Sequence, residues 1–340
     1  MKVDSVTQFA LGAAVGEAVL GKKIGHKAML WGGLCGTIPD LDVFIPMGNA
    51  VADFTYHRSF SHSLFVLLLL TPLVAWLAMK IHQQPQKMRQ RWWLMIYLVF
   101  ATHVLLDSFT AYGTQIFWPF VTTPMTWSTL FIIDPFYTVP LLVGLIGVLA
   151  MKRNKRRSHR WNLAGLVLSS IYLMWSIGVK IHVDHKIQQG LLAQGVEYQR
   201  LFTTPAPFNT LLWRGVAMTE DGYHEVYYSV FDDAPPSTNP YYPSQNNLLT
   251  SLRSQWSVQR LQWFTKGFYG VKLKDNKIII SDLRMGLEPA YVFQFAVAKQ
   301  NANQVMAIDA MQMQPERDLN VLTKVWERIW SDDVVISPAA

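Results

Sequence analysis

Long apolar runs separated by short polar stretches fill the first half of the chain. Four of them are long enough to predict membrane-spanning helices, because a helix needs about 20 predominantly apolar residues to cross a bilayer. These runs cover Ser63–Met79, Trp92–Leu106, Pro135–Met151 and Trp161–Val179. Two weaker segments precede them. Val3–Leu20 is rich in small residues, which let helices pack closely in lipid, and Ala28–Ile38 is too short to span alone.

From residue 183 onward the pattern changes to short alternating runs and turn clusters. Runs such as His224–Phe231, Gly270–Leu273, Lys277–Ile280 and Ala290–Val297 predict β-strands. Helices are predicted at Ile187–Phe202, Leu248–Trp263 and Leu319–Trp330. The predicted fold is therefore an all-α polytopic membrane bundle at residues 1–182, followed by a soluble α+β outer domain at residues 183–340.

Charge is scarce and unevenly placed along the 340 residues. Only 16% of the residues are charged, where soluble domains carry about 25%, which argues against a wholly soluble enzyme. Residues 1–182 hold 16 Lys and Arg against 7 Asp and Glu, and 13 of those 16 fall at 22–27, 80–91 and 152–160. Basic loops between apolar runs indicate cytoplasmic loops. Topology thus explains the net charge of +7, and no nucleic-acid partner is predicted.

This orientation gathers ionisable side chains of the first half on the outer side of the membrane. They are Asp4, Asp40, Asp42, Asp53, Asp107, Asp134, His57, His62 and His103. Ionisable residues near a membrane are costly and usually functional, and Asp and His are ligands of zinc and similar ions. The single cysteine, Cys35, excludes a disulfide framework and a multi-Cys zinc site. The set predicts a metal centre.

Pro39–Asp42 ends the second segment with two carboxylates close together. Such carboxylates repel each other unless a cation neutralises them. The alternative is a solvated polar turn, so this motif alone leaves the choice open.

His57–Ser63 places two histidines, His57 and His62, at the entry to the first strong span. Arg58, between them, suits an oxyanion such as phosphate because its guanidinium offers a planar fork of donors. Ser61 can instead cap the helix that follows.

His103 and Asp107 are spaced i, i+4, which puts both on one face of a helix. Both can reach one metal ion, or Asp107 can orient the imidazole from behind. The alternative is a buried His–Asp hydrogen bond. Asp134 begins the third span, where it either joins the site or caps the helix.

Five motifs occur in a specific order: Asp4–Gln8, Gly12–Glu17, Pro39–Asp42, His57–Ser63 and His103–Asp107. Together they resemble the YdjM-type family, described as inner-membrane, metal-dependent hydrolases, over roughly residues 1–180. The resemblance implies a bacterial inner-membrane location and a distant similarity to zinc-dependent phospholipase C, whose zinc ions are held by His and Asp. Many relatives have His where this chain has Gln8, and the sequence leaves open whether Gln8 replaces a ligand.

The predicted function is an integral membrane hydrolase, with its site at the outer membrane–water interface, acting on a phospholipid or other phosphoester. The predicted metal ligands are Asp40, Asp42, His57, His62, His103 and Asp107. The predicted catalytic residues are Asp42, Arg58 and Asp134. Zinc is the expected metal, because it lowers the pKa of bound water and polarises the scissile group. The expected partners are the lipid bilayer and this substrate.

A non-enzymatic alternative stays open. The chain would then be a membrane scaffold or metal-binding membrane protein whose outer domain binds partners. A transporter is disfavoured because Glu17 is almost alone as a midplane polar group, and an intramembrane protease lacks a His-Glu-x-x-His motif. The sequence does not decide the substrate, the metal number or the oligomeric state.

Overall fold

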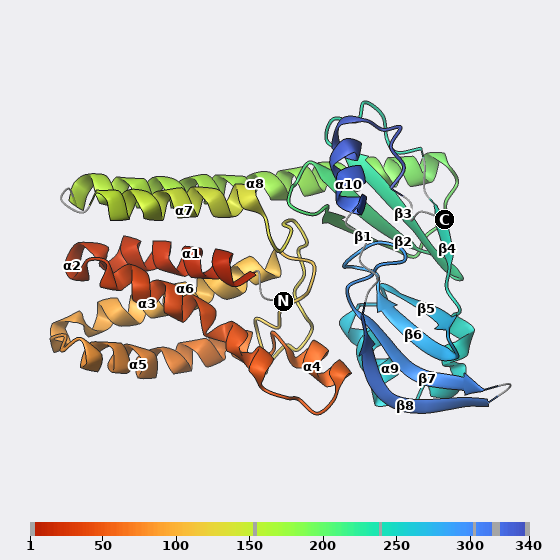
Figure 1. Ribbon diagram of the computed structural model, residues 1–340, viewed down its shortest axis with the longest axis horizontal. Helices are drawn as coiled ribbons and strands as arrows, with labels where there is room; N and C mark the ends of the chain where they lie inside the picture. Colours follow the sequence, from red (N-terminus) through yellow and green to blue (C-terminus); the bar gives the residue numbers. More distant parts are fainter. Residues whose placement is uncertain (1–3, 152–154, 238–239, 302–303, 315–319, 337–340) are drawn as a thin grey trace. The chain divides into compact units, whose positions relative to one another are not determined.

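The computed structural model describes residues 4–151, 155–237, 240–301, 304–314 and 320–336 (Figure 1). Lys152 and Arg153 of the third basic cluster lie outside these ranges. By its contacts the chain forms two compact units. The first contains Met1–Ile45 and His57–Ser176, and the second contains Pro46–Tyr56 and Ile177–Ala340.

The first unit is helical. Its longer helices are α1 (Asp4–Gly16), α3 (Lys27–Thr37), α5 (Leu64–Ile81), α6 (Arg89–Ser108), α7 (Pro135–Ala150) and the first part of α8 (Lys155–Ala193). Its short elements are the π-helical turn η1 (Glu17–Gly21), α2 (Lys22–Ile24) and the 3-10 turns η2 (Pro39–Phe44), η3 (Phe60–His62) and η4 (Gln86–Met88). The six predicted helical segments are thus helical where the structure describes them, apart from the end residues Ile38, Ser63 and Met151.

The prediction of an all-α polytopic membrane bundle is wrong. Within the described ranges, two helices are long and apolar enough to cross a membrane, Leu64–Ile81 and Arg156–Ala193. Helix α7 has only 16 residues, and α6 carries Arg89 and Arg91 in its first turn. The alternation of six spans, from which an outer position of the C-terminal domain follows, therefore lacks support.

Helix α6 shows why hydrophobicity misleads here. Trp92, Met95, Ile96 and Phe100 are fully buried, packed inside the first unit. A run that forms the core of a helical bundle is as apolar as one that faces lipid, and sequence alone does not separate the two cases. Helix α6 leaves Trp93, Leu94 and Leu105 exposed, whereas α5 exposes more of its large apolar side chains, among them Leu68, Leu69 and Leu73.

Helices α1 and α3 cross at unusually close range, because glycines face each other. A Cβ atom on Gly32 would lie 2.1 Å from the backbone oxygen of Gly12, and one on Gly16 would lie 2.3 Å from that of Ala28. Only hydrogen fits at these contacts. This crossing brings the N-terminal residues of α1 beside the end of α3, next to the site described below.

Gly32→Ala is therefore expected to destabilise the protein by about 1–3 kcal/mol, since the added methyl group pushes two backbones apart. Gly178→Ala on α8 is the matched control, because a Cβ atom there meets nothing within 4 Å and alanine favours helix. Thermal unfolding of the detergent-solubilised protein measures both. Equal midpoints for the two variants would contradict the close crossing.

The second unit contains two four-stranded antiparallel sheets, with strands in sequence order. One is β1 (Arg200–Pro205), β2 (Leu212–Met218), β3 (Gly222–Ser229) and β4 (Tyr241–Pro243). The other is β5 (Tyr269–Lys274), β6 (Lys277–Asp282), β7 (Gln294–Asn301) and β8 (Gln304–Met313). The helical elements are α4 (Ala50–Tyr56), η5 (Asn246–Leu252), α9 (Trp256–Phe264), α10 (Asn320–Trp330) and the end of α8. This mixed architecture is consistent with the predicted soluble α+β domain.

Strand β2 was not predicted, and its burial explains why. Every residue of Leu212–Met218 is buried, so the strand lacks the polar alternation that reveals a half-exposed strand. On one side, Trp213 packs against Val183, Ile187 and Leu191 of α8. The predicted helix at Ile187–Phe202 is thus the end of α8, which stops at Ala193 before β1 begins.

Candidate metal centre

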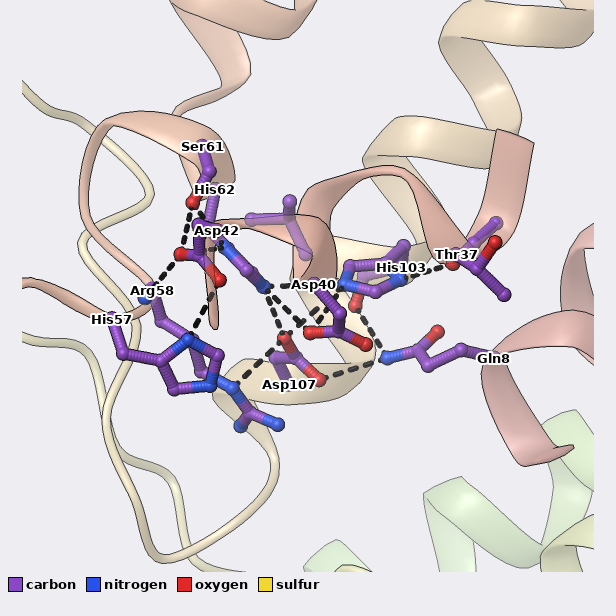
Figure 2. Close-up of polar contacts among 12 residues, drawn as sticks. Gln8, Thr37, Asp40, Asp42, His57, Arg58, Ser61, His62, His103 and Asp107 are labelled. Atoms are coloured by element: carbon purple, nitrogen blue, oxygen red, sulfur yellow. Dashed lines mark hydrogen bonds and ion pairs between the residues drawn. The ribbon is translucent and has the colours of Figure 1, made fainter. Parts of the chain in front are cut away.

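Two carboxylates and two imidazoles converge in the first unit (Figure 2). Asp40 lies on η2, His62 ends η3, and His103 and Asp107 lie one turn apart on α6. Pro39 cannot continue an α-helix and opens η2, which turns Asp40 toward the other three residues. One ligand atom from each of the four lies within 4.8 Å of every other. The four can therefore hold a divalent ion.

The polar atoms face one another at short range. His62 Nε2 lies 3.3 Å from His103 Nε2, and Asp107 Oδ2 lies 3.1 Å from the first nitrogen and 3.4 Å from the second. Asp40 Oδ1 lies 3.3 Å from His62 Nε2. His62, His103 and Asp107 are buried, while the Asp40 side chain is 21% exposed. The group is thus closed on three sides and accessible at Asp40.

Hydrogen bonds at Nδ1 fix the orientation of both imidazole rings. His103 Nδ1–H donates to the carbonyl oxygen of Gly36 (2.7 Å). His62 Nδ1–H donates to Ser61 Oγ (2.9 Å), and the Ser61 hydroxyl donates to Asp42 Oδ2 (2.5 Å). Because these contacts use the Nδ1 atoms, both Nε2 atoms face the group. This is how metal-binding histidines are usually oriented in proteins.

The acidic and basic side chains of the group stabilise one another's charged forms. Burial alone would raise the pKa of Asp107, but Arg58 and His103 hold it well below its usual range. Burial lowers the pKa of His103, but Asp107 and Asp40 outweigh it and raise this pKa to about 10. Asp107 Oδ2 is buried, and in the described part of the chain no hydrogen bond of good geometry reaches it, although His62 Nε2 (3.1 Å) and Arg58 Nε (3.3 Å) face it. The donor set fits a divalent metal, whose place is taken by a proton when no metal is bound.

Asp42 and His57, also predicted as ligands, lie beside this group rather than in it. Asp42 Oδ1 accepts a hydrogen bond from His57 Nδ1 (2.8 Å), and Oδ2 accepts from the Arg58 backbone N–H (3.1 Å) as well as from Ser61. Both carboxylate oxygens are thus already engaged. Burial and the charge of Arg58 lower the pKa of His57, against the opposing hydrogen bond to Asp42.

Arg58 is buried against the group rather than exposed on a loop. Its Nε lies 3.3 Å from Asp107 Oδ2, its Nη1 lies 3.3 Å from Thr110 Oγ1, and the guanidinium lies over the Tyr112 ring. Arg58 has a φ of 61°, a left-handed conformation that is rare for a residue with a side chain. Such backbone strain is often found at functional sites.

Asp134 caps a helix. Its Oδ1 accepts from the Phe136 N–H at the start of α7 (2.9 Å), and its Oδ2 accepts from the Tyr172 hydroxyl (2.9 Å). It is not a member of the group of four. A catalytic role for Asp134 stays a prediction, and capping is the role that its contacts favour. The cap of α5 is Ser63 rather than Ser61.

Gln8 is a supporting residue whose role the sequence left open. Its Nε2 donates to Asp107 Oδ1 (2.8 Å) and to the His103 carbonyl oxygen (3.3 Å). These bonds orient Asp107 so that Oδ2 faces the two imidazoles. The carbonyl of Gly36 and the hydroxyl of Ser61 support the group in the same way, and no local pattern marks a backbone carbonyl as a partner of His103.

Gln8→Ala should therefore weaken metal binding by about 10- to 100-fold, the usual effect of losing a residue that orients a ligand. Titration with Zn²⁺ against a chelating dye measures the affinity. Gln115→Ala, which removes another buried glutamine of the first unit, is the control. An unchanged affinity in Gln8→Ala would mean that Asp107 is held without it.

Comparison with known protein families identifies the family of this chain. The model of the family described as YdjM inner membrane protein matches residues 3–182, more than half of the chain. The chain belongs to the YdjM inner membrane protein family. The matched segment contains all four residues of the group, together with Gln8, Asp42 and His57. The YdjM resemblance seen in the motifs is thereby confirmed, and the family is one of inner membrane proteins.

A curated relative matches this YdjM-family chain more distantly. YfhP from Bacillus subtilis (strain 168), described as an uncharacterized protein, is 26% identical over 150 residues. The match covers 42% of this chain and 45% of YfhP, so less than half of the relative is represented. No solved structure matches the chain significantly. The similarity to zinc-dependent phospholipase C therefore stays a prediction.

Proposed function

We propose that this protein is a membrane-associated, metal-dependent hydrolase of phosphoester bonds. The observation that carries the proposal is the pair of imidazole Nε2 atoms 3.3 Å apart, facing two carboxylates and oriented by hydrogen bonds from behind. Structural cores rarely bury so many ionisable groups around one point, because each must be desolvated. Asp40, His62, His103 and Asp107 would hold one ion, and their two nitrogen and two oxygen donors suit zinc.

The bound metal would supply an activated water and polarise the phosphoester. The Asp42–His57 pair is the proposed proton acceptor. His57 Nδ1–H is held by Asp42, which leaves Nε2 as the ring nitrogen that takes the proton, and the lowered pKa keeps the ring neutral near pH 7. Arg58, already 3.3 Å from Asp107, is the proposed anchor for the phosphate oxygens.

Exposed apolar side chains near the group support an amphiphilic substrate. On η2, which also contains Asp40, the side chains of Leu41 and Phe44 are 51% and 79% exposed. Phe120, 76% exposed, contacts Phe65 in the first turn of α5. This candidate span begins two residues after His62. A metal-bound headgroup with its acyl chains against these side chains is the arrangement we propose for a phospholipid or another lipid phosphoester.

The test uses purified full-length protein loaded with Zn²⁺ and supplied with phospholipid in mixed micelles. Released water-soluble phosphate compounds are measured, with a soluble phosphodiester as the comparison substrate. Hydrolysis of lipid in preference to the soluble ester supports the proposal. Bound metal without hydrolysis of either substrate would instead favour the scaffold alternative.

Arg58→Lys should lower this turnover by about 10- to 100-fold, because lysine keeps the charge beside Asp107 but cannot bind phosphate with two parallel hydrogen bonds. The metal content should stay unchanged, since guanidinium is not a ligand. Lys180→Arg is the matched control for exchanging these two side chains elsewhere. Wild-type turnover in Arg58→Lys would remove the phosphate-anchoring role.

A further inference from the structure

A short segment near the metal centre is folded into the second unit. The chain leaves the first unit after Ile45 and returns to it at His57. The segment between them, Pro46–Tyr56, belongs by its contacts to the second unit and contains α4. The residues that flank it are those that support the site, Asp42 on one side and the His57–Arg58 pair on the other.

Helix α4 depends on the second unit for its structure. It has seven residues, and isolated helices shorter than about 12 residues are not stable in water. The Phe54 ring packs against Phe264 of α9 (4.7 Å between centroids), Phe293 (4.5 Å) and Phe295 of β7 (5.1 Å). Burial of the Phe54 ring against these three rings is the main contact that can stabilise so short a helix.

Polar contacts complete this attachment. Arg260 of α9 donates from Nε to Thr55 Oγ1 (3.0 Å), and its guanidinium lies 4.5 Å from the Tyr56 ring centroid. Tyr56 immediately precedes His57. The last residue of α4 is thus held by α9, and the next residue along the chain is the partner of Asp42.

The two ends of the segment are tied together at the metal centre. Asp42 bonds to His57 Nδ1 and to the Arg58 N–H, and through Ser61 it orients His62. A loop whose tip is fixed loses less conformational entropy when its ends meet than a loop with a free tip. Fixing α4 therefore favours the Asp42–His57 contact, and through Ser61 the orientation of His62.

We propose that the second unit controls the geometry of the metal centre through α4, with Phe54 as a positioning residue. A partner or ligand that loosens the packing of α4 would weaken the Asp42–His57 contact and lower metal affinity. Coupling of this kind is reciprocal, so metal binding should in turn stabilise α4. The proposal concerns regulation of the proposed metal site and rests on that function for its biological meaning.

The test compares Phe54→Ala with Phe268→Ala in the full-length protein. Phe268 is also buried in the second unit, but it packs in a different cluster with Val216 and Tyr223. Hydrogen exchange of the metal-free protein is measured for the peptide covering residues 57–63, and Co²⁺ affinity is measured by visible absorption. We expect about tenfold faster exchange and about tenfold weaker Co²⁺ binding in Phe54→Ala alone. Phe54→Leu should restore most of both.

The proposal is overturned if Phe54→Ala and Phe268→Ala lower the unfolding temperature but leave exchange at residues 57–63 and Co²⁺ affinity equal to each other. Helix α4 would then serve only the stability of the second unit. If Phe54→Ala fails to fold, Phe54→Leu against Phe268→Leu makes the same comparison. A wild-type protein that binds no Co²⁺ contradicts the proposed metal site, while the exchange comparison still decides whether α4 positions His57 and its neighbours.

Discussion

The His103→Ala variant is expected to lose bound zinc and hydrolytic activity together. His103 contributes one of four converging ligand atoms, and its Nε2 lies within 3.7 Å of one in each of the other three residues. Losing a residue that only orients a ligand costs about 10- to 100-fold in affinity, so losing a ligand should cost more than about 100-fold. Elemental analysis of the purified protein measures the zinc directly.

His82→Ala is the control for this variant. His82 is also in the first unit but accepts a hydrogen bond from Trp31 (2.7 Å) outside the group. It should retain wild-type zinc and activity. Equal zinc in His103→Ala and the wild type would refute the metal centre, because the pair of facing imidazoles would then have another purpose.

Metal affinity is expected to rise with pH by about tenfold per unit between pH 6 and 9, a total of about 1,000-fold. Asp107 and Asp40 raise the pKa of His103 to about 10 against the effect of burial. In the metal-free protein the imidazole is therefore positively charged throughout this pH range, with a proton on Nε2 in addition to the one on Nδ1. The metal must displace that proton. Each unit by which the pH falls therefore lowers the metal affinity about tenfold.

Calorimetry in buffers of different ionisation enthalpy tests this prediction, because it counts the protons released per Zn²⁺ bound. At least one proton should be released at pH 8. A competing chelator provides the affinity at each pH. An affinity that does not change between pH 7 and 9 would show that the imidazoles are already neutral in the metal-free protein.

Several features of the site followed from the sequence, because they depend on local geometry. The i, i+4 spacing put His103 and Asp107 on one helical face, and Pro39 marked the end of α3 beside Asp40. The motif order was specific enough to indicate the YdjM family. The strands that were predicted, such as β3 and β6, form hairpins or pair with sequence neighbours.

Tertiary structure decided which of the predicted residues share one point. Asp40 and Asp42 lie two positions apart in one 3-10 turn, yet Asp40 faces the imidazoles while Asp42 bonds to His57 and Ser61. Spacing does not reveal this difference, because it depends on where η3 and α6 lie. The bond from Gln8 to Asp107, 99 positions away in sequence, depends equally on the close crossing of α1 and α3.

Burial decided the rest. Strand β2 and one face of helix α6 are apolar because they are buried in protein, and hydrophobicity by itself does not distinguish protein from lipid as the surrounding medium. The placement of Pro46–Tyr56 in the second unit rests on the packing of Phe54 against Phe264 and on the hydrogen bond from Arg260 to Thr55, whose residues are 205 positions apart in sequence. Local propensity determined the elements of this protein, whereas long-range packing determined what surrounds them.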